Sequence, residues 1–466
     1  MAQITKDTNI RTELFESIPI PKAVMKLAVP SVLSSLVMVI YNLADTYYVG
    51  MLDNPIQNAA VTLAAPVLLA FNAVNNLFGV GSSSMMSRAL GRKDIDTVKR
   101  SSAFGFYSAL FCGLMLSLFY TVFQNPLLVL LGSDAENITA TRQYLLWTTS
   151  CGAAPAILNV VMAYLVRAEG ASLHASLGTM SGCFLNIILD PIFILPWGLD
   201  MGAAGAGLAT FLSNCFACGY FFVLLAIKRG KTYVCISPKM FRPSRDIVKG
   251  VCGVGIPAAI QNLLNVTGMT VLNNFASDFG SDAVAAVGIA QKINMIPFQI
   301  ALGSSQGIMP LVSYNYSSGN RKRMKNAILF TSAIAVSFLT AVTMGYYFGA
   351  EGLIRMFMKT PAVVEYGTRF LRGICLALPF LCIDFIAVGV FQACGLGRLS
   401  LVFAILRKIV LEIPALNLFN RISPLYGLAY AQPAAEVILA IAAVFVLLRL
   451  LRCPTEQRMQ GNGQHF

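Results

Sequence analysis

Residues 23–50 read AVMKLAVPSVLSSLVMVIYNLADTYYVG, an apolar block with a single lysine and a single aspartate. A helix needs about 20 mostly apolar residues to cross a bilayer, so this block is long enough to do so. Eleven further blocks of similar character follow it. They occupy residues 59–87, 97–124, 141–166, 174–196, 202–227, 247–277, 284–314, 325–349, 364–394, 398–420 and 427–450. The sequence therefore predicts an all-α integral membrane protein with about twelve transmembrane helices.

The composition of the whole chain agrees with this prediction. Of its 466 residues, 56% are hydrophobic and 12% are charged, and the mean hydropathy is +0.69. Soluble domains average about 45–50% apolar and about 25% charged residues, which differs clearly from this chain. The net charge of +13 could suggest a nucleic-acid partner. However, lysine and arginine cluster in the short gaps between apolar blocks, so we expect no nucleic-acid binding.

The distribution of these basic residues predicts the orientation of the chain. With the N-terminus in the cytoplasm, 25 lysines and arginines lie on the cytoplasmic side, six lie outside and three lie within spans. Cytoplasmic loops of membrane proteins carry an excess of lysine and arginine, so this orientation is the favoured one. Both termini are then cytoplasmic, with residues 1–22 and 451–466 as tails.

The two halves of the sequence resemble each other. AVPSVL around Pro30 matches GIPAAI around Pro257, and five further short matches follow in the same order at a similar offset. Each half holds six spans, and an even number gives both halves the same orientation. We therefore predict two six-helix lobes, residues 23–227 and 247–450, related by a pseudo-two-fold axis along the membrane normal. The basic segment 228–246 is the predicted cytoplasmic linker between them.

Two carboxylates lie inside spans of the first half, where charged groups are costly and usually functional or paired. Asp45 and Asp190 both fall about 7–10 Å below the outer ends of their helices. Tyr41 precedes Asp45 by one turn, and Asn186 precedes Asp190 by one turn, so each pair shares a helix face. These four side chains can converge on one polar pocket that takes up a proton or binds Na⁺ at Asp45, Asp190 and Asn186. The alternative is that Asp45 only accepts hydrogen bonds near a wet interface.

The second half carries a different set of intramembrane charges. Asp384 lies at the same depth as Arg407 and Lys408 of the next span, so an ion pair is geometrically feasible. Lys408 and Glu412 form an i,i+4 pair. We interpret this group as a neutralised structural network, with a second ion site as the alternative. Lys292, just inside another span, has no partner that the sequence identifies.

The sequence contains no motif that predicts catalysis. It has no HExxH, and GVGSSSMMS near Gly81 lacks the GK[ST] ending of a phosphate-binding loop. We therefore expect no enzymatic activity, no cofactor and an ion gradient as the energy source. Within transport, a flippase or exporter of a lipid-linked or polar metabolite is the alternative, although it would need more cationic residues within the spans. A membrane sensor would need a ligand-binding domain, which the sequence does not show.

Several short segments together resemble the multidrug and toxic compound extrusion (MATE) family, in particular its bacterial MepA-like branch. The resemblance covers residues 20–450. Its segments are ADTYYVG from Ala44, NIILDP from Asn186, GAAGAGLAT from Gly202, PLVSYNYSSGN from Pro310 and FQACGLGR from Phe391. Each segment is modest, but the combination is specific.

The resemblance implies an antiporter in the bacterial inner membrane that works as a monomer by alternating access. Such proteins export small organic, often cationic or amphipathic, compounds in exchange for H⁺ or Na⁺, and membrane lipid surrounds them. The family pattern implies ion coupling at Asp45 and Asp190, with Tyr41 and Asn186 as neighbours and Pro30 as a helix bend.

In one place the sequence departs from the family pattern. Some relatives carry a glutamate in the seventh span, where AAIQNLLNVTGMT offers only Gln261, Asn262 and Asn265. We therefore do not expect a cation site built on a Glu–Asp pair in the second lobe.

Overall fold

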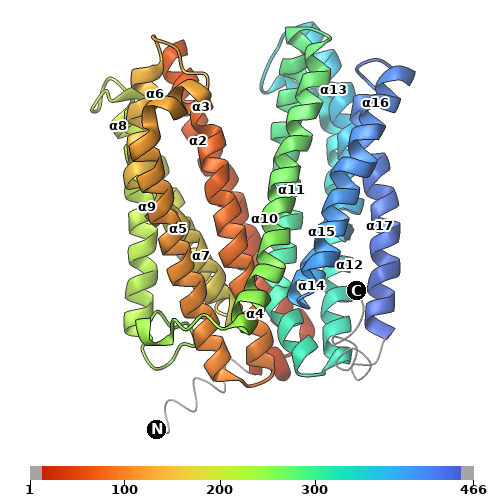
Figure 1. Cartoon of the computed structure of the whole chain (residues 1–466). Coiled ribbons are helices and arrows are strands. Elements are labelled where there is room, and N and C mark those ends of the chain that lie inside the picture. Colours follow the sequence, from red (N-terminus) through yellow and green to blue (C-terminus); the bar gives the residue numbers. More distant parts are fainter. Residues whose placement is uncertain (1–12, 453–466) are drawn as a thin grey trace.

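A computed structural model of the chain describes residues 13–452, which form helices joined by short turns (Figure 1). No strand occurs within that range. The predicted all-α class is therefore confirmed. Most of the two predicted tails, residues 1–22 and 451–466, lies outside the described residues.

The first lobe contains six membrane-crossing segments, two of which consist of several helical pieces. Its elements are α2 (Ile20–Gly50), α3 (Pro55–Val74), η1 (Asn75–Val80), α4 (Gly81–Gly91), α5 (Ile95–Leu130), α6 (Ile138–Leu145), η2 (Leu146–Cys151), α7 (Ala153–Ala168), α8 (Ser172–Ile194) and α9 (Gly202–Ile227). The pieces η1 and η2 are π-helical stretches. The first joins α3 and α4 into one helix, Pro55–Gly91, and the second continues α6 as far as Cys151. A turn of π-helix is rare and is often found at functional positions.

The second lobe repeats this plan. Its elements are α10 (Arg245–Ser277), α11 (Ser281–Ser317), α12 (Arg321–Arg355), α13 (Pro361–Cys375), α14 (Leu378–Ala393), α15 (Gly397–Ile405), η4 (Leu406–Glu412), α16 (Ile413–Ile422) and α17 (Leu428–Arg452). A short 3₁₀ turn, η3 (Pro238–Met240), lies in the segment between the lobes. The two six-helix lobes that the sequence predicts are therefore present.

Length and hydropathy support membrane insertion. Among the described residues, nine helices are long and apolar enough to cross a bilayer. Two further spans are bent pairs, with angles of 51° between α6–η2 and α7 and 45° between α13 and α14. The segment from α15 to α16 is the remaining span of the second lobe. Its hydropathy is lowered by three charged residues at its centre, Arg407, Lys408 and Glu412. In contrast, α2 runs unbroken through Pro30, the residue that the family pattern assigns to a bend.

Polar side chains fix several helix ends. The Asp94 carboxylate accepts a hydrogen bond from the Thr97 amide at 3.1 Å, which caps the start of α5. Hydrogen bonds from Thr97 hold the pKa of Asp94 below its ordinary value. Ser244 caps α10, and Asn320 caps α12, in the same way. These caps place the loops between spans at defined positions.

The two lobes pack together at the end of the bundle where the described chain begins. There α2 of the first lobe lies against α11 of the second. A Cβ atom added to Gly307 would lie 2.6 Å from the Ala28 Cα, and one added to Gly303 would lie 2.8 Å from the Val32 Cα. Only glycine permits such a close approach of two helix backbones. In Figure 1 the ribbons of the two lobes converge toward this end and diverge toward the opposite end.

Polar contacts reinforce the same junction. The Ser84 hydroxyl of α4 donates to the Gln392 carbonyl of α14 at 2.6 Å, and both residues are buried. The Arg167 guanidinium of α7 donates to the Gln306 side chain of α11 at 3.4 Å. The lobes are therefore sealed at this end by apolar packing and by buried hydrogen bonds.

Candidate functional site

The first-lobe carboxylates lie where α2, α8 and α9 pack together. Asp190 and Asn186 of α8 are fully buried. With its amide nitrogen facing the carboxylate, Asn186 donates to the two Asp190 oxygens at 2.8 and 3.2 Å. The Asn186 oxygen then accepts from the Thr210 amide of α9 at 3.2 Å. Thus α9 orients Asn186, and Asn186 orients Asp190.

Asp45 and Tyr41 approach the same place from α2. The Tyr41 side chain lies next to that of Thr210. The carboxylates of Asp45 and Asp190 lie close enough to repel each other electrostatically. The phenol of Tyr144, which is buried on α6, is close to both carboxylates. The structure therefore brings together the four residues that the sequence singles out, and it adds Thr210 and Tyr144.

This group is acidic and has no basic counterpart. No ion pair involving Asp45 or Asp190 occurs within residues 13–452. One Asp45 oxygen is buried without a hydrogen-bond partner in the same range. An ionised carboxylate that is buried away from water, with no ion pair or hydrogen bond in return, loses several kcal/mol of solvation free energy. The pocket is thus suited to a proton or a small cation, either of which removes this cost.

The donor set suits a hard cation but does not form a conventional metal centre. Among the described residues, no group of three or more histidine, cysteine, aspartate or glutamate side chains could hold a metal ion. Two carboxylates remain, with the hydroxyls of Thr210 and Tyr41 beside them. Oxygen ligands of this kind are compatible with Na⁺. They are equally compatible with a proton bound to one of the two acids.

The second lobe contains a buried network of charges, and its geometry is well defined. Arg407 contacts Asp384 at 2.6 Å and Glu436 at 2.9 Å, and its guanidinium lies over the Phe385 ring at 4.5 Å. Lys408 contacts Glu412 of the same helix at 2.6 Å. The ion pairs expected between Asp384 and Arg407 and between Lys408 and Glu412 are therefore present.

The sequence analysis missed one member of this network. Glu436 is buried on α17, two spans after Asp384, and no spacing in the chain connects the two residues. The available signal was the one acidic residue in the block 427–450. With Glu436 the network holds three acids and two bases, one acid more than the sequence predicts.

Two residues noted in the sequence lie outside the acidic pocket of the first lobe and outside the charged network of the second. Lys292 is exposed on α11 and takes part in neither network. Gln261, one of the three amides in the seventh span, accepts a hydrogen bond from Gln392 at 3.1 Å. In the second lobe, α10 therefore contributes an uncharged hydrogen bond, and the third acid of the charged network, Glu436, comes from α17.

Comparison with known protein families gives a consistent result. The family model MatE matches the chain twice, at residues 30–192 and 257–417. One match falls in each lobe, in agreement with the internal repeat.

Curated relatives align along almost the whole chain. "Multidrug export protein MepA" of Staphylococcus aureus (strain MRSA252) is 32% identical over 452 residues, which cover 96% of this chain and 98% of the relative. The protein of the same name from Staphylococcus haemolyticus (strain JCSC1435) is 33% identical and covers 94% and 95% of the two chains.

Solved structures share the same arrangement. One described as the outward-facing conformation of a multidrug resistance MATE family transporter superimposes with a TM-score of 0.89 and 26% identity, covering 94% of this chain and 97% of the other. A MATE structure in a bent conformation gives a TM-score of 0.86 at 26% identity, covering 95% and 97%.

Proposed function

Because the chain belongs to the MatE family, we propose that it is a secondary active exporter of organic, often cationic, compounds in exchange for H⁺ or Na⁺. Relatives named as multidrug export proteins align with both lobes, which supports export of small molecules. The sequence has no phosphate-binding loop for ATP, so the energy source is an ion gradient.

The observation that carries ion coupling is the acidic pocket of the first lobe. Asp45 and Asp190 lie together on two different helices, and no basic residue among those described neutralises them. When neither proton nor cation is bound, the two carboxylates repel each other, which favours a pocket open to water or to a cationic compound. When a proton or Na⁺ is bound, the repulsion falls and α2 can pack more closely against α8.

This charge dependence can drive transport by selecting between two lobe arrangements. A ligand shifts a conformational equilibrium only by the difference between its affinities for the two states. The ion binds more tightly to the arrangement in which the carboxylates are close, and a cationic compound binds more tightly to the arrangement in which they are ionised. Ion and compound therefore favour opposite states, and alternation between these states gives exchange.

We place the protein in the bacterial inner membrane as a monomer, with both chain termini in the cytoplasm. The segment 228–246 between the lobes carries six lysines and arginines and lies at the same end of the bundle as the start of α2. A concentration of basic residues at one end is typical of the cytoplasmic side. In this orientation the sealed end faces the cytoplasm.

Transport of a lipid-linked or polar metabolite has less support. A carrier of phosphate-bearing compounds needs unpaired cationic side chains within its spans. Arg407 and Lys408 lie within a span, but both contact carboxylates. The acidic pocket at Asp190 favours cationic compounds instead.

Reconstitution in liposomes tests the proposal directly. Efflux of a fluorescent organic cation is measured with an imposed pH gradient alone, and then with an imposed Na⁺ gradient alone. Export driven by either gradient supports antiport and identifies the ion. If neither gradient drives export of any cationic compound that binds the protein, the proposal is wrong.

A further inference from the structure

The chain before α2 forms a short segment, residues 14–18, that reaches from one lobe to the other at the sealed end. The amides of Ser17 and Ile18 both donate to the Glu13 carbonyl at 2.9 Å, so the segment is a compact turn. Through Pro19 it continues directly into α2 of the first lobe. In Figure 1 this red start of the described chain lies at the end of the bundle where the two lobes converge. We call residues 14–18 the N-terminal strap.

The second lobe holds the backbone of the N-terminal strap. The Arg323 guanidinium of α12 donates to the carbonyls of Leu14 at 3.3 Å and Phe15 at 2.5 Å. It also donates to the Ile18 carbonyl. The Asn315 amide of α11 donates to the Phe15 carbonyl at 3.2 Å. A charged donor makes a stronger hydrogen bond than a neutral one, so Arg323 is the main polar anchor of the strap.

A bond between side chains adds to this anchorage. The Tyr314 hydroxyl of α11 donates to the Glu16 carboxylate. Tyr314 is fully buried whereas Glu16 is exposed, so this bond lies at the edge of the strap that faces water. The anchors therefore come from the last turn of α11 and the first turn of α12, which both belong to the second lobe.

The Phe15 side chain is held between the two lobes. Its ring is fully buried and stacks on Tyr314 of the second lobe, with 4.8 Å between the ring centroids. The ring also meets Gly170, in the turn between α7 and α8 of the first lobe. A Cβ atom added to Gly170 would lie 2.9 Å from the Phe15 ring and 3.2 Å from the Leu14 side chain. The missing side chain at Gly170 thus makes room for Phe15 in the first lobe.

These contacts are compatible with only one arrangement of the lobes. The strap is covalently joined to α2 of the first lobe, but its hydrogen bonds are made to the second lobe. If the lobes separate at this end, either the strap leaves Arg323 and Tyr314, or Phe15 leaves Gly170. In both cases the Phe15 ring loses part of its burial, and this loss opposes the separation.

We propose that the N-terminal strap is a latch that holds the sealed end closed and must release before that end can open. This inference rests on the proposed alternation between two lobe arrangements. The strap binds only one of these arrangements, so it shifts the equilibrium toward that arrangement, as a ligand with unequal affinities does. In the proposed orientation the latch controls the opening through which a compound enters from the cytoplasm.

The test measures opening of this end in the full-length protein, with its native cysteines replaced. Spin labels are placed at Lys93, in the turn between α4 and α5, and at Arg449, in the last turn of α17; both side chains are exposed. Arg323→Gln removes the main anchor of the strap. It should raise the fraction of molecules with a long label distance by at least about fivefold, the lower end of typical coupling between two sites. An unchanged distance distribution would show that the strap does not hold this end closed.

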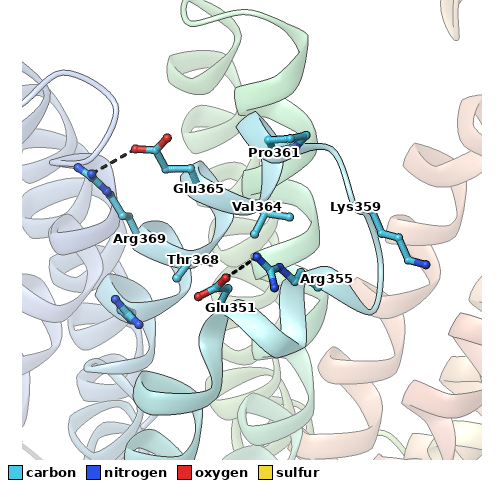
Figure 2. Close-up of a pocket in the computed structure, with 9 residues that line it drawn as sticks. Glu351, Arg355, Lys359, Pro361, Val364, Glu365, Thr368 and Arg369 are labelled. Carbon is cyan, nitrogen blue, oxygen red and sulfur yellow. Dashed lines mark ion pairs between the residues drawn. The ribbon is translucent and has the colours of Figure 1, made fainter.

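Arg355→Gln is the matched control. Arg355 lies in the same helix, α12, but at the opposite end of the bundle, where it pairs with Glu351 at 2.7 Å (Figure 2). This variant also loses an arginine and its bonds, but it leaves the strap untouched, so its label distances should stay as they are without it. An increase as large as that in Arg323→Gln would mean that loss of an α12 arginine, and not release of the strap, opens the end, and the proposal would be wrong.

Two milder substitutions keep the test decisive if Arg323→Gln folds poorly. Tyr314→Phe removes the bond to Glu16 but keeps the ring that stacks on Phe15, and Glu16→Gln weakens the same bond. Each should raise the long-distance fraction less than Arg323→Gln does, and the double variant no more than Tyr314→Phe alone. Unchanged distances in both would overturn the latch. The measurement needs neither a transported compound nor a gradient, so a failure of the proposed export is seen separately from a failure of the latch.

Discussion

At the scale of single residues, Asp190 is the most constrained group in the first lobe. It is fully buried, and both its oxygens accept from Asn186. Asp190→Asn keeps the size of the side chain but cannot take up a proton and binds Na⁺ poorly. A coupling free energy of about 1–3 kcal/mol corresponds to a change in affinity of about 5- to 150-fold. We therefore expect active export to fall at least about fivefold. Efflux from liposomes at matched protein content measures this.

Asp45→Asn should have the same effect, because both carboxylates belong to one pocket. Residues that act as a unit are not additive, so the double variant should export little worse than either single variant. Binding of the organic compound, measured by fluorescence without a gradient, is the control for folding. Wild-type export by both single variants would exclude this pocket from the mechanism.

Substitutions in the charged network of the second lobe should lower thermal stability by unequal amounts. Arg407→Gln leaves Asp384 and Glu436 buried without their cation, and loss of one partner of a buried ion pair costs about 3–5 kcal/mol. Asp384→Asn leaves Arg407 paired with Glu436, so it should lower the melting temperature much less. Thermal unfolding in detergent compares the two. Exchange stoichiometry should remain normal in Asp384→Asn, and a change in it would indicate a second coupling site.

At the scale of elements, the contact between α2 and α11 decides how the sealed end closes. Gly307→Ala places a Cβ at 2.6 Å from the Ala28 Cα, so the two helices must separate. We expect slower export and a larger distance between spin labels at Lys22 and Lys322, which are exposed on α2 and α12. Gly345→Ala is the control, since nothing lies within 4 Å of the added Cβ. Unchanged label distances in Gly307→Ala would contradict the role of this contact.

The segment before α2 adds a second closure at this end. The Phe15 ring is buried, stacks on Tyr314 of α11 at 4.8 Å and lies beside Gly170 of the first lobe. The Arg323 guanidinium donates to the Phe15 carbonyl at 2.5 Å. Because Phe15 contacts both lobes, Phe15→Ala should lower the melting temperature. Truncation of a buried aromatic side chain lowers the free energy of unfolding by at most about 3–5 kcal/mol. Thermal unfolding measures the loss, and an unchanged melting temperature would show that the contact is not stabilising.

At the scale of the whole molecule, the orientation in the membrane is open to a simple test. Cys235 lies in the segment between the lobes and is partly exposed. In the proposed orientation a membrane-impermeant thiol reagent should label it only after the cytoplasmic side is made accessible. The test needs a variant in which the other cysteines are replaced by serine or alanine. Labelling of Cys235 in intact cells would reverse the orientation.

The sequence by itself determined the fold class, the number of spans and the two-lobe plan. These follow from the length of the apolar blocks and from the order of the repeated segments, which are local properties of the chain. It also placed Asp45 near Asp190, because depth along a helix can be counted from the helix end.

Only the tertiary structure decided which side chains meet across helices. Rotation of a helix about its axis depends on all its neighbours. The sequence therefore could not show that Thr210 lies beside Asn186 or that Tyr144 lies near the two first-lobe carboxylates. Nor could it show that Glu436 pairs with Arg407. A sequence records which charges a membrane protein carries, but the packing of its helices decides which of them remain unpaired.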